Sequence, residues 1–281
     1  MSIAGGLHLA FELGHAAGCD CLQIFVKNQR QWVAKPLDDA SIAAFTGAWK
    51  RSTISPIVAH ATYLINLAAP DGDNRQKSIR ATIDELERCE ALGLMGLVLH
   101  PGAHLGAGIE EGVRRIASAL DEIHKSTSGF KTRVLLENTA GQGSTIGSKP
   151  AELRGIIDGV MEPERLGACI DTCHLFAAGY DLRDAGKYDE MMGELDSTVG
   201  LNRIACLHVN DSKAGCGSHL DRHEHIGEGQ IGQTGFVRLL NDPRLAHVPR
   251  ILETDKGGDG RSVELDMKNL ATLRGYVGRQ P

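Results

Sequence analysis

The chain has 281 residues, a length that suits one closed α/β barrel or two smaller domains. It is 42% hydrophobic and 23% charged, which excludes wholesale disorder, and no apolar run approaches the ~20 residues that a membrane-spanning helix needs. Lys and Arg number 30 against 36 Asp and Glu, so the formal charge of −6 disfavours a protein that coats nucleic acid through a basic face.

The cysteines and the first residues of the chain indicate in which cellular compartment the protein resides. The seven cysteines are odd in number and irregularly spaced, which fits a reducing environment better than a disulfide framework. The chain begins without the basic segment of a signal peptide and carries Glu12 early. We therefore expect a cytoplasmic protein with no membrane association and no obligate protein partner.

Short apolar runs alternate with longer amphipathic runs along the chain. The short runs predict strands that are apolar on both faces, as in a parallel sheet, at residues 21–25, 54–59, 96–99, 133–136, 166–170, 204–207 and 250–252. Helical periodicity is clearest in residues 73–93, where Ile79, Ile83 and Leu86 fall on one face. The other predicted helices cover 37–49, 110–124, 149–161, 184–195, 236–240 and 263–276.

Repeated strand–helix units predict a parallel α/β fold, either an open sheet or a closed barrel. Metal-binding types of side chain follow six of the seven predicted strands: His60, His100, Glu137, Asp171, His208 and Glu253. In a barrel the carboxyl ends of all strands meet at one rim, whereas an open sheet gathers functional residues only at its switch point. The pattern favours a single barrel domain over residues 1–281.

Loops after two of these strands add His174, Asp221 and His223. Imidazoles and carboxylates together suit borderline metals such as zinc or manganese, and the set is large enough for two or three ions with a bridging carboxylate. Each residue alone is equally compatible with a hydrogen-bonded structural role. Cys173 could also bind zinc, but its place between Asp171 and His174 predicts that it faces the barrel wall.

Several long segments resemble the endonuclease IV family of zinc-dependent apurinic/apyrimidinic endonucleases. The two most specific are CIDTCHLFAAGYD at 169–181 and HVNDSKAGCGSHLDRHEHIGEG at 208–229. Further similar segments lie at 26–32, 58–68, 99–106 and 137–143. The resemblance extends over nearly the whole chain from Ala4 onward.

The resemblance implies a (β/α)8 TIM barrel that binds three Zn²⁺ per chain, with Mn²⁺ as an alternative at one site. It assigns the ligands as His60, His100 and Glu137 for one ion, Glu137 with Asp171, His208 and Glu253 for the second, and His174, Asp221 and His223 for the third. It also implies that Arg30, Tyr63 and Leu64 contact duplex DNA at an abasic site.

One departure from the family pattern concerns the first strand. Only Met1, Ser2 and Ile3 precede the Ala-Gly-Gly segment, where the family has a strand. Seven strands are therefore predicted where eight are expected. Either the natural start lies upstream, or the barrel lacks or truncates its first strand.

The resemblance implies hydrolysis of the phosphodiester 5′ to an abasic site, giving a 3′-hydroxyl and a 5′-deoxyribose phosphate. Glu137 is the expected catalytic residue, because it would position the attacking hydroxide. The alternative enzyme is a metal-dependent sugar isomerase or epimerase on a similar barrel. A non-enzymatic alternative is a DNA-damage-binding module, which the complete ligand set argues against.

Overall fold

The computed structural model describes residues 1–257 and 262–280. The chain divides into two compact units. The first comprises Met1–Leu136 and Ile156–Gly167, and the second comprises Glu137–Gly155 and the described residues from Ala168 onward. Each unit contains parallel strands followed by helices, which is the local pattern that the sequence predicts.

The first unit contains four parallel strands paired in chain order. They are β1 (Leu22–Ile24), β2 (Ile57–His60), β3 (Gly96–Leu99) and β4 (Arg133–Glu137), whose last residue belongs to the second unit. Leu22 pairs with Ile57, and Gly96 pairs with Arg133. Residues of β1, β2 and β3 are buried along their whole length because both faces of the strands are covered.

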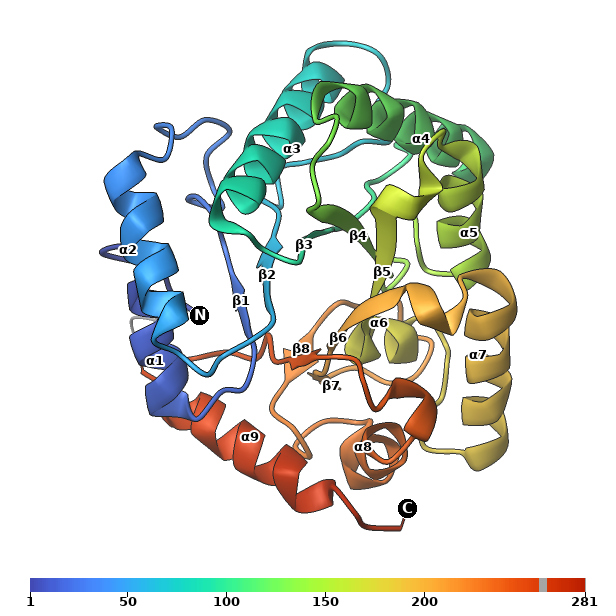
Figure 1. The fold of residues 1–281 in the computed structure, drawn as a ribbon. Coiled ribbons are helices and arrows are strands. Elements are labelled where there is room, and N and C mark those ends of the chain that lie inside the picture. The colour runs from blue at the N-terminus through green and yellow to red at the C-terminus, as the bar shows by residue number, and fades with distance from the viewer. Residues whose placement is uncertain (258–261, 281) are drawn as a thin grey trace. The chain divides into compact units, whose positions relative to one another are not determined.

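Helices of the first unit lie beside its strands. They are α1 (Leu9–Ala17), α2 (Asp39–Lys50), α3 (Asp73–Leu92) and α4 (Ile109–Ser126). In Figure 1, α3 and α4 lie side by side, and the two helices are in contact. On α4 the buried residues Ile116, Leu120 and Ile123 share one face, as their spacing of four and three requires. Gly93 ends α3 in the left-handed conformation with φ of 73°.

The second unit contains the parallel strands β5 (Leu166–Asp171), β6 (Ile204–His208) and β9 (Arg250–Ile251), the first two residues of β5 belonging to the first unit. Its helices are α6 (Thr172–Ala177), α7 (Ala185–Thr198), α8 (Gly232–Leu240) and α9 (Glu264–Tyr276); α8 and α9 are in contact (Figure 1). The helix α5 (Pro150–Gly159) has residues in both units. Three short 3-10 helices, η1 (Pro163–Arg165), η2 (Leu201–Arg203) and η3 (Pro243–Leu245), precede β5, β6 and β9.

All seven predicted strands are confirmed, with ends that shift by a few residues. No strand precedes α1 in the described residues. The ammonium group of Met1 donates a hydrogen bond to the carbonyl of Gln23 on β1, so the first residues run beside β1 without forming a strand.

Two helices and one pair of strands were not expected from the sequence. One is α1, and another is α6, which spans only six residues and is buried throughout, so it has no polar face to give a helical period. The third is the antiparallel pair of β7 (Asp211–Ser212) and β8 (His223–Glu224), which joins residues on either side of a long loop. In the described part of the chain, every helix is too short or too polar to span a lipid bilayer.

Candidate metal centre

Six of the predicted ligand residues stand at the carboxyl ends of parallel strands. Those that end a strand are His60 on β2, Glu137 on β4, Asp171 on β5 and His208 on β6. His100 follows β3 directly, and Glu253 lies two residues beyond β9. The remaining three lie on α6 (His174), in the loop between β7 and β8 (Asp221) and on β8 (His223).

In the first unit, the imidazole rings of His60 and His100 lie close together, with their centroids 5.5 Å apart. His60 is buried, and its Nδ1 is 2.7 Å from the carbonyl oxygen of Ala61. Donation from Nδ1–H to that carbonyl leaves the lone pair on Nε2, which is the arrangement that orients histidines for metal binding. The ring of Tyr63 lies 5.1 Å from that of His60 and 6.1 Å from that of His100, centroid to centroid.

In the second unit, Glu137, Asp171, His208 and Glu253 form the carboxylate-rich cluster. Their ligand atoms all lie within 4.8 Å of one another. Nδ1 of His208 is 2.8 Å from Oε1 of Glu137 and 2.9 Å from Oε2 of Glu253. Three carboxylates and one imidazole at this spacing make a donor set that suits a divalent cation.

His174, Asp221 and His223 join Asp171 in an adjoining cluster, the histidine-rich cluster. Oδ1 of Asp221 is 3.2 Å from Nε2 of His174 and 3.3 Å from Nε2 of His223. The ligand atoms of Asp171, His174 and His223 lie within 4.8 Å of one another. Because Asp171 belongs to both clusters, the seven predicted ligands of the second unit form one continuous group.

Backbone carbonyls orient both histidines of the histidine-rich cluster. Nδ1 of His174 lies 2.9 Å from the carbonyl oxygen of Asn138, and Nδ1 of His223 lies 3.2 Å from that of Glu253. In each ring, donation from Nδ1–H leaves Nε2 as the lone-pair nitrogen on the side of Asp221. In the neutral form of each ring, this contact favours the tautomer that can bind a metal ion through Nε2.

The electrostatics of the clusters favour a positive charge. Burial alone would lower the pKa of His208, but the charges of Glu253 and Glu137 outweigh it and hold this pKa well above its ordinary value. Burial would also lower the pKa of His174, but the charges of Asp171 and other carboxylates outweigh it and raise this pKa to about 10. The buried carboxylates therefore need compensation, which protons on histidine or a bound cation can provide.

Two asparagines that were not predicted as site residues support the ligands. Asn210 donates from Nδ2 to Oδ2 of Asp171 at 2.6 Å, and its Oδ1 accepts from the backbone N–H of Glu253 at 2.7 Å. Oδ1 of Asn138 accepts from the backbone N–H of Asp171 at 2.6 Å. Asn138 lies one residue after Glu137, and Asn210 lies two residues after His208. This closeness to predicted ligands was the signal in the sequence that could have identified them.

The structure corrects the placement of Cys173. Its Sγ lies within 4.8 Å of ligand atoms of Asp221 and His223, so it adjoins the histidine-rich cluster instead of facing away from it. Burial, with the nearby charge of Asp171, raises the pKa of the Cys173 thiol to about 12. The thiol donates a hydrogen bond to the carbonyl of Arg222, with Sγ 3.6 Å from the oxygen.

The three residues expected to contact DNA lie on loops after β1 and β2 of the first unit. Arg30 is exposed, and the side chains of Tyr63 and Leu64 are 60% and 38% exposed. The hydroxyl of Thr62 donates to the carbonyl of Gln29, which ties the loop of Arg30 to the loop of Tyr63. Large apolar side chains exposed this far are available for a partner.

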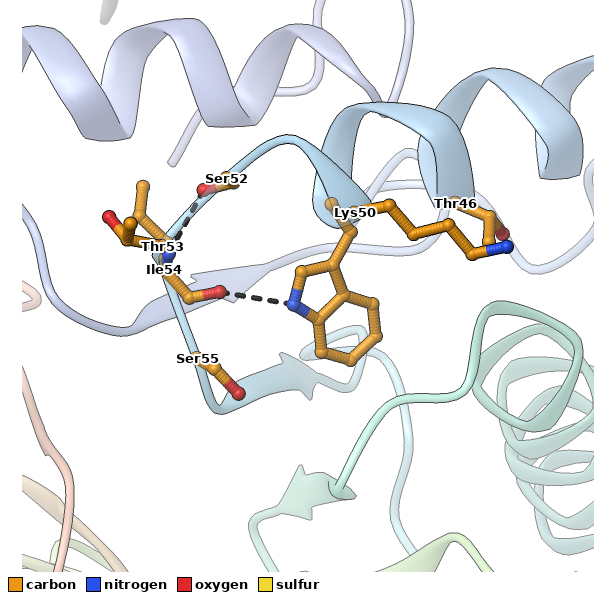
Figure 2. Close-up of a pocket in the computed structure, with 7 residues that line it drawn as sticks. Thr46, Lys50, Ser52, Thr53, Ile54 and Ser55 are labelled. Carbon is orange, nitrogen blue, oxygen red and sulfur yellow. Dashed lines mark hydrogen bonds between the residues drawn. The ribbon is translucent and has the colours of Figure 1, made fainter.

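A pocket elsewhere in the first unit contains none of the predicted site residues. Figure 2 shows it between the end of α2 and the segment that precedes β2, lined by Thr46, Trp49, Lys50, Ser52, Thr53, Ile54 and Ser55. The indole N–H of Trp49 donates to the carbonyl of Ile54 at 3.0 Å. One lysine is the only ionisable group among these lining residues, so the pocket offers no cluster for acid–base or metal chemistry.

Known proteins resemble this chain in both sequence and fold. Residues 11–273 match the family model described as a xylose isomerase-like TIM barrel. The chain is 50% identical over 277 residues to a probable endonuclease 4 of Chloroflexus aggregans, an alignment that covers 99% of this chain and 96% of the relative.

Solved structures resemble this chain in fold, and one of them also resembles it in sequence. The crystal structure of endonuclease IV from Thermus thermophilus superimposes with a TM-score of 0.85 at 35% identity, covering 99% of this chain and 97% of that one. A D-tagatose 3-epimerase-like protein matches with a TM-score of 0.73 at 21% identity, covering 98% and 94%, which is evidence of a shared fold alone. This chain therefore belongs to the endonuclease IV family and has the TIM-barrel fold.

Proposed function

We propose that this protein is a DNA-repair nuclease that hydrolyses the phosphodiester 5′ to an abasic site in duplex DNA. The observation that carries the proposal is the convergence of seven predicted ligands of the second unit into two clusters that share Asp171. Membership of the endonuclease IV family supports the assignment of DNA as the substrate. We further propose that residues 1–281 act as one domain.

The residues present fit divalent cations. Nδ1 of His60, His174 and His223 each lies within 3.2 Å of a backbone carbonyl oxygen, which directs Nε2 to a ligand. We propose three Zn²⁺ per chain. The first would be held by His60, His100 and Glu137, the second by Glu137, Asp171, His208 and Glu253, and the third by His174, Asp221 and His223.

Bound at these residues, the cations would supply Lewis acidity at the phosphate and ready access to hydroxide at neutral pH. Glu137 would orient the attacking oxygen in line with the scissile bond, because its carboxylate is fully buried and fixed by His208. The oxygen of water forms a bond to phosphorus, and the bond from phosphorus to the 3′-oxygen breaks. The 3′-oxygen takes up a proton, leaving a 3′-hydroxyl and a 5′-deoxyribose phosphate.

Selection of damaged DNA would rest on the exposed loops of the first unit. An abasic nucleotide has no base to unstack, so its extrusion costs less than that of an intact nucleotide by up to roughly a few kcal/mol. Tyr63 and Leu64 are exposed apolar side chains of the kind that wedge between base steps, and Arg30 carries a charge that suits phosphate.

The decisive experiment incubates the purified protein with a duplex that contains one abasic site, with and without a chelator. We expect nicking on the 5′ side of the site, loss of nicking with chelator, and recovery on addition of Zn²⁺. Metal analysis should find close to three ions per chain. An absence of chelator-sensitive nicking, with one or two ions per chain, would instead favour a sugar isomerase or epimerase.

Substitution of a proposed ligand tests the site itself. We expect Glu137→Gln and His100→Ala to abolish cleavage while circular dichroism shows the wild-type fold. Glu190→Gln, which changes an exposed carboxylate on α7, is the matched control and should cleave like wild type. Wild-type turnover in Glu137→Gln with unchanged zinc content would contradict the assignment.

A further inference from the structure

The carboxylate of Asp211, the first residue of β7, is enclosed by the backbone of the segment that follows β8. The side chain is fully buried. Its two oxygens accept hydrogen bonds of 2.8 to 3.4 Å from the backbone N–H groups of Ser212, Gly227, Gly229, Ile231 and Gly232. Hydrogen bonds to a charged acceptor are stronger than those between neutral groups, so this one side chain fixes the path of residues 227–232.

The segment approaches the carboxylate so closely that one of its positions requires glycine. A Cβ at Gly229 would lie 2.5 Å from Oδ1 of Asp211 and 2.5 Å from the carbonyl oxygen of Ser212, which is closer than non-bonded atoms come. Glycine at this position therefore lets the backbone close around Asp211. The backbone N–H of Gln230 also donates to the carbonyl of Ser212 at 2.8 Å, which fastens the segment to β7 itself.

The strand pair that Asp211 supports places two of the proposed metal ligands. β7 and β8 have two residues each, and Ser212 on β7 lies opposite His223 on β8. A two-stranded ribbon is at best marginally stable by itself, so one this short needs support from outside. Asp221 lies two residues before His223, so the positions of both ligands depend on the pairing of β7 with β8.

We propose that Asp211 is a positioning residue, which holds β8 so that Asp221 and His223 meet His174 at the third proposed ion. The inference rests on the proposed function and adds to it a residue that is not one of the proposed ligands. β7 contacts α6, the helix of His174, so the pairing of β8 with β7 sets the distance between the ligands. That distance is short, because Oδ1 of Asp221 lies 3.2 Å from Nε2 of His174 and 3.3 Å from Nε2 of His223.

Substitution of Asp211 tests this role through metal binding. Asp211→Asn keeps the size of the side chain, but in either orientation its NH₂ group faces a backbone N–H, that of Gly227 or that of Ile231. We expect one of the three Zn²⁺ to bind about 10- to 100-fold more weakly, which is the usual effect of removing a residue that orients a ligand. The other two ions should keep wild-type affinity. Dialysis at fixed free Zn²⁺ concentrations, followed by metal analysis, counts the ions held at each concentration.

The matched control is Asp242→Asn, because Asp242 is another buried carboxylate of the second unit that accepts from a backbone N–H. It caps η3 and binds Arg244 and the hydroxyl of Tyr188. This variant loses charged hydrogen bonds of the same kind, so its melting temperature should also fall, yet it should hold three ions. The comparison separates a loss of stability from a loss of ligand positioning.

Gly229→Ala disturbs the same contacts from the opposite side and keeps the test open if Asp211→Asn does not fold. Its methyl group would press on the carboxylate of Asp211, so the same ion should bind more weakly. Gly215→Ala is its control, since a Cβ at Gly215, in the loop between β7 and β8, meets open space among the described residues.

Wild-type affinity for all three ions in folded Asp211→Asn or Gly229→Ala would overturn the inference. Equal weakening of all three ions would also overturn it, as would loss of the same ion in Asp242→Asn. A wild-type protein that binds fewer than three Zn²⁺, or that does not nick the abasic duplex, would instead contradict the proposed function.

Discussion

Asp171 shows how one side chain serves the fold and the candidate site together. Its Oδ1 caps α6 by accepting from the backbone N–H of His174 at 2.7 Å. Its Oδ2 accepts from Asn210 at 2.6 Å. Because hydrogen bonds hold both oxygens, the carboxylate has one fixed orientation, in which it faces both clusters. The ligands of the second unit therefore depend on residues that are not ligands themselves.

Asn210 gives a direct test of this support. We expect Asn210→Ala to weaken zinc binding by roughly 10- to 100-fold, because Asp171 loses a donor and the backbone N–H of Glu253 loses its acceptor. Competition with a fluorescent chelator measures the affinity. Asn241→Ala is the control, since the amide of Asn241 donates to the carbonyls of Val237 and Tyr276 and accepts from the backbone N–H of Gly278, and these three residues are not proposed ligands. Equal zinc affinity in the two variants would contradict the supporting role.

Among the elements, a buried carboxylate links α7 to the segment that precedes β9. Asp242 accepts from the hydroxyl of Tyr188 on α7 at 2.9 Å and from Nε of Arg244 at 2.9 Å. It also caps η3, where its Oδ1 accepts from the backbone N–H of Arg244. Burial alone would raise the pKa of Asp242, but the hydrogen bonds from Arg244 outweigh it and lower this pKa below its ordinary value.

This lowered pKa predicts an acid-sensitive contribution to stability. A carboxyl whose pKa is lower in the folded state stabilises the protein above its unfolded pKa of about 3.9, and that stabilisation is lost as the pH falls through the folded pKa. We expect Asp242→Asn to reduce the free energy of unfolding by about 1–3 kcal/mol near pH 7. The difference from wild type should shrink towards pH 3.

Denaturant titrations across this pH range measure the effect. Asp189→Asn is the matched control, because Asp189 is an exposed partner of the same Arg244 at 3.3 Å. Exposed pairs contribute little at any pH, so this variant should follow the wild-type curve. The explanation would be contradicted if the free energies of unfolding of wild type and Asp242→Asn differed by the same amount at neutral and at acid pH.

For the chain as a whole, negative charge concentrated in the carboxylate-rich and histidine-rich clusters links metal binding to stability. Asp171, Glu137 and His208 are fully buried, so the carboxylates repel one another with little screening unless a cation or protons intervene. The formal charge of −6 would be balanced by the proposed three Zn²⁺. A ligand that binds only the folded state stabilises it in proportion to the logarithm of its concentration.

We therefore expect Zn²⁺ to raise the melting temperature and a chelator to lower it. At a free concentration about 100 times Kd, each site would add about 2.7 kcal/mol to the free energy of unfolding. Differential scanning calorimetry measures the change, and Glu137→Gln should show a smaller response than wild type. Identical melting curves with metal and with chelator would show that the clusters do not bind a cation.

Much of the fold followed from hydrophobic patterning. The seven strands are short apolar runs with both faces covered, and α3 and α4 repeat apolar residues at helical spacing, so local sequence specifies both. The helix α6 and the β7–β8 pair were not predicted, because hydrophobic patterning is the signal that identified the other elements. Neither has a period of its own, and each forms because of what packs around it.

Residue chemistry and order along the chain were enough to nominate the ligands, since parallel strands place their carboxyl ends at one edge. They were not enough to place Cys173 beside His223 or to make Asn138 and Asn210 partners of Asp171. Those relations join side chains far apart in sequence. They depend on distances and directions that exist only after the strands and loops have packed, and no local pattern encodes them.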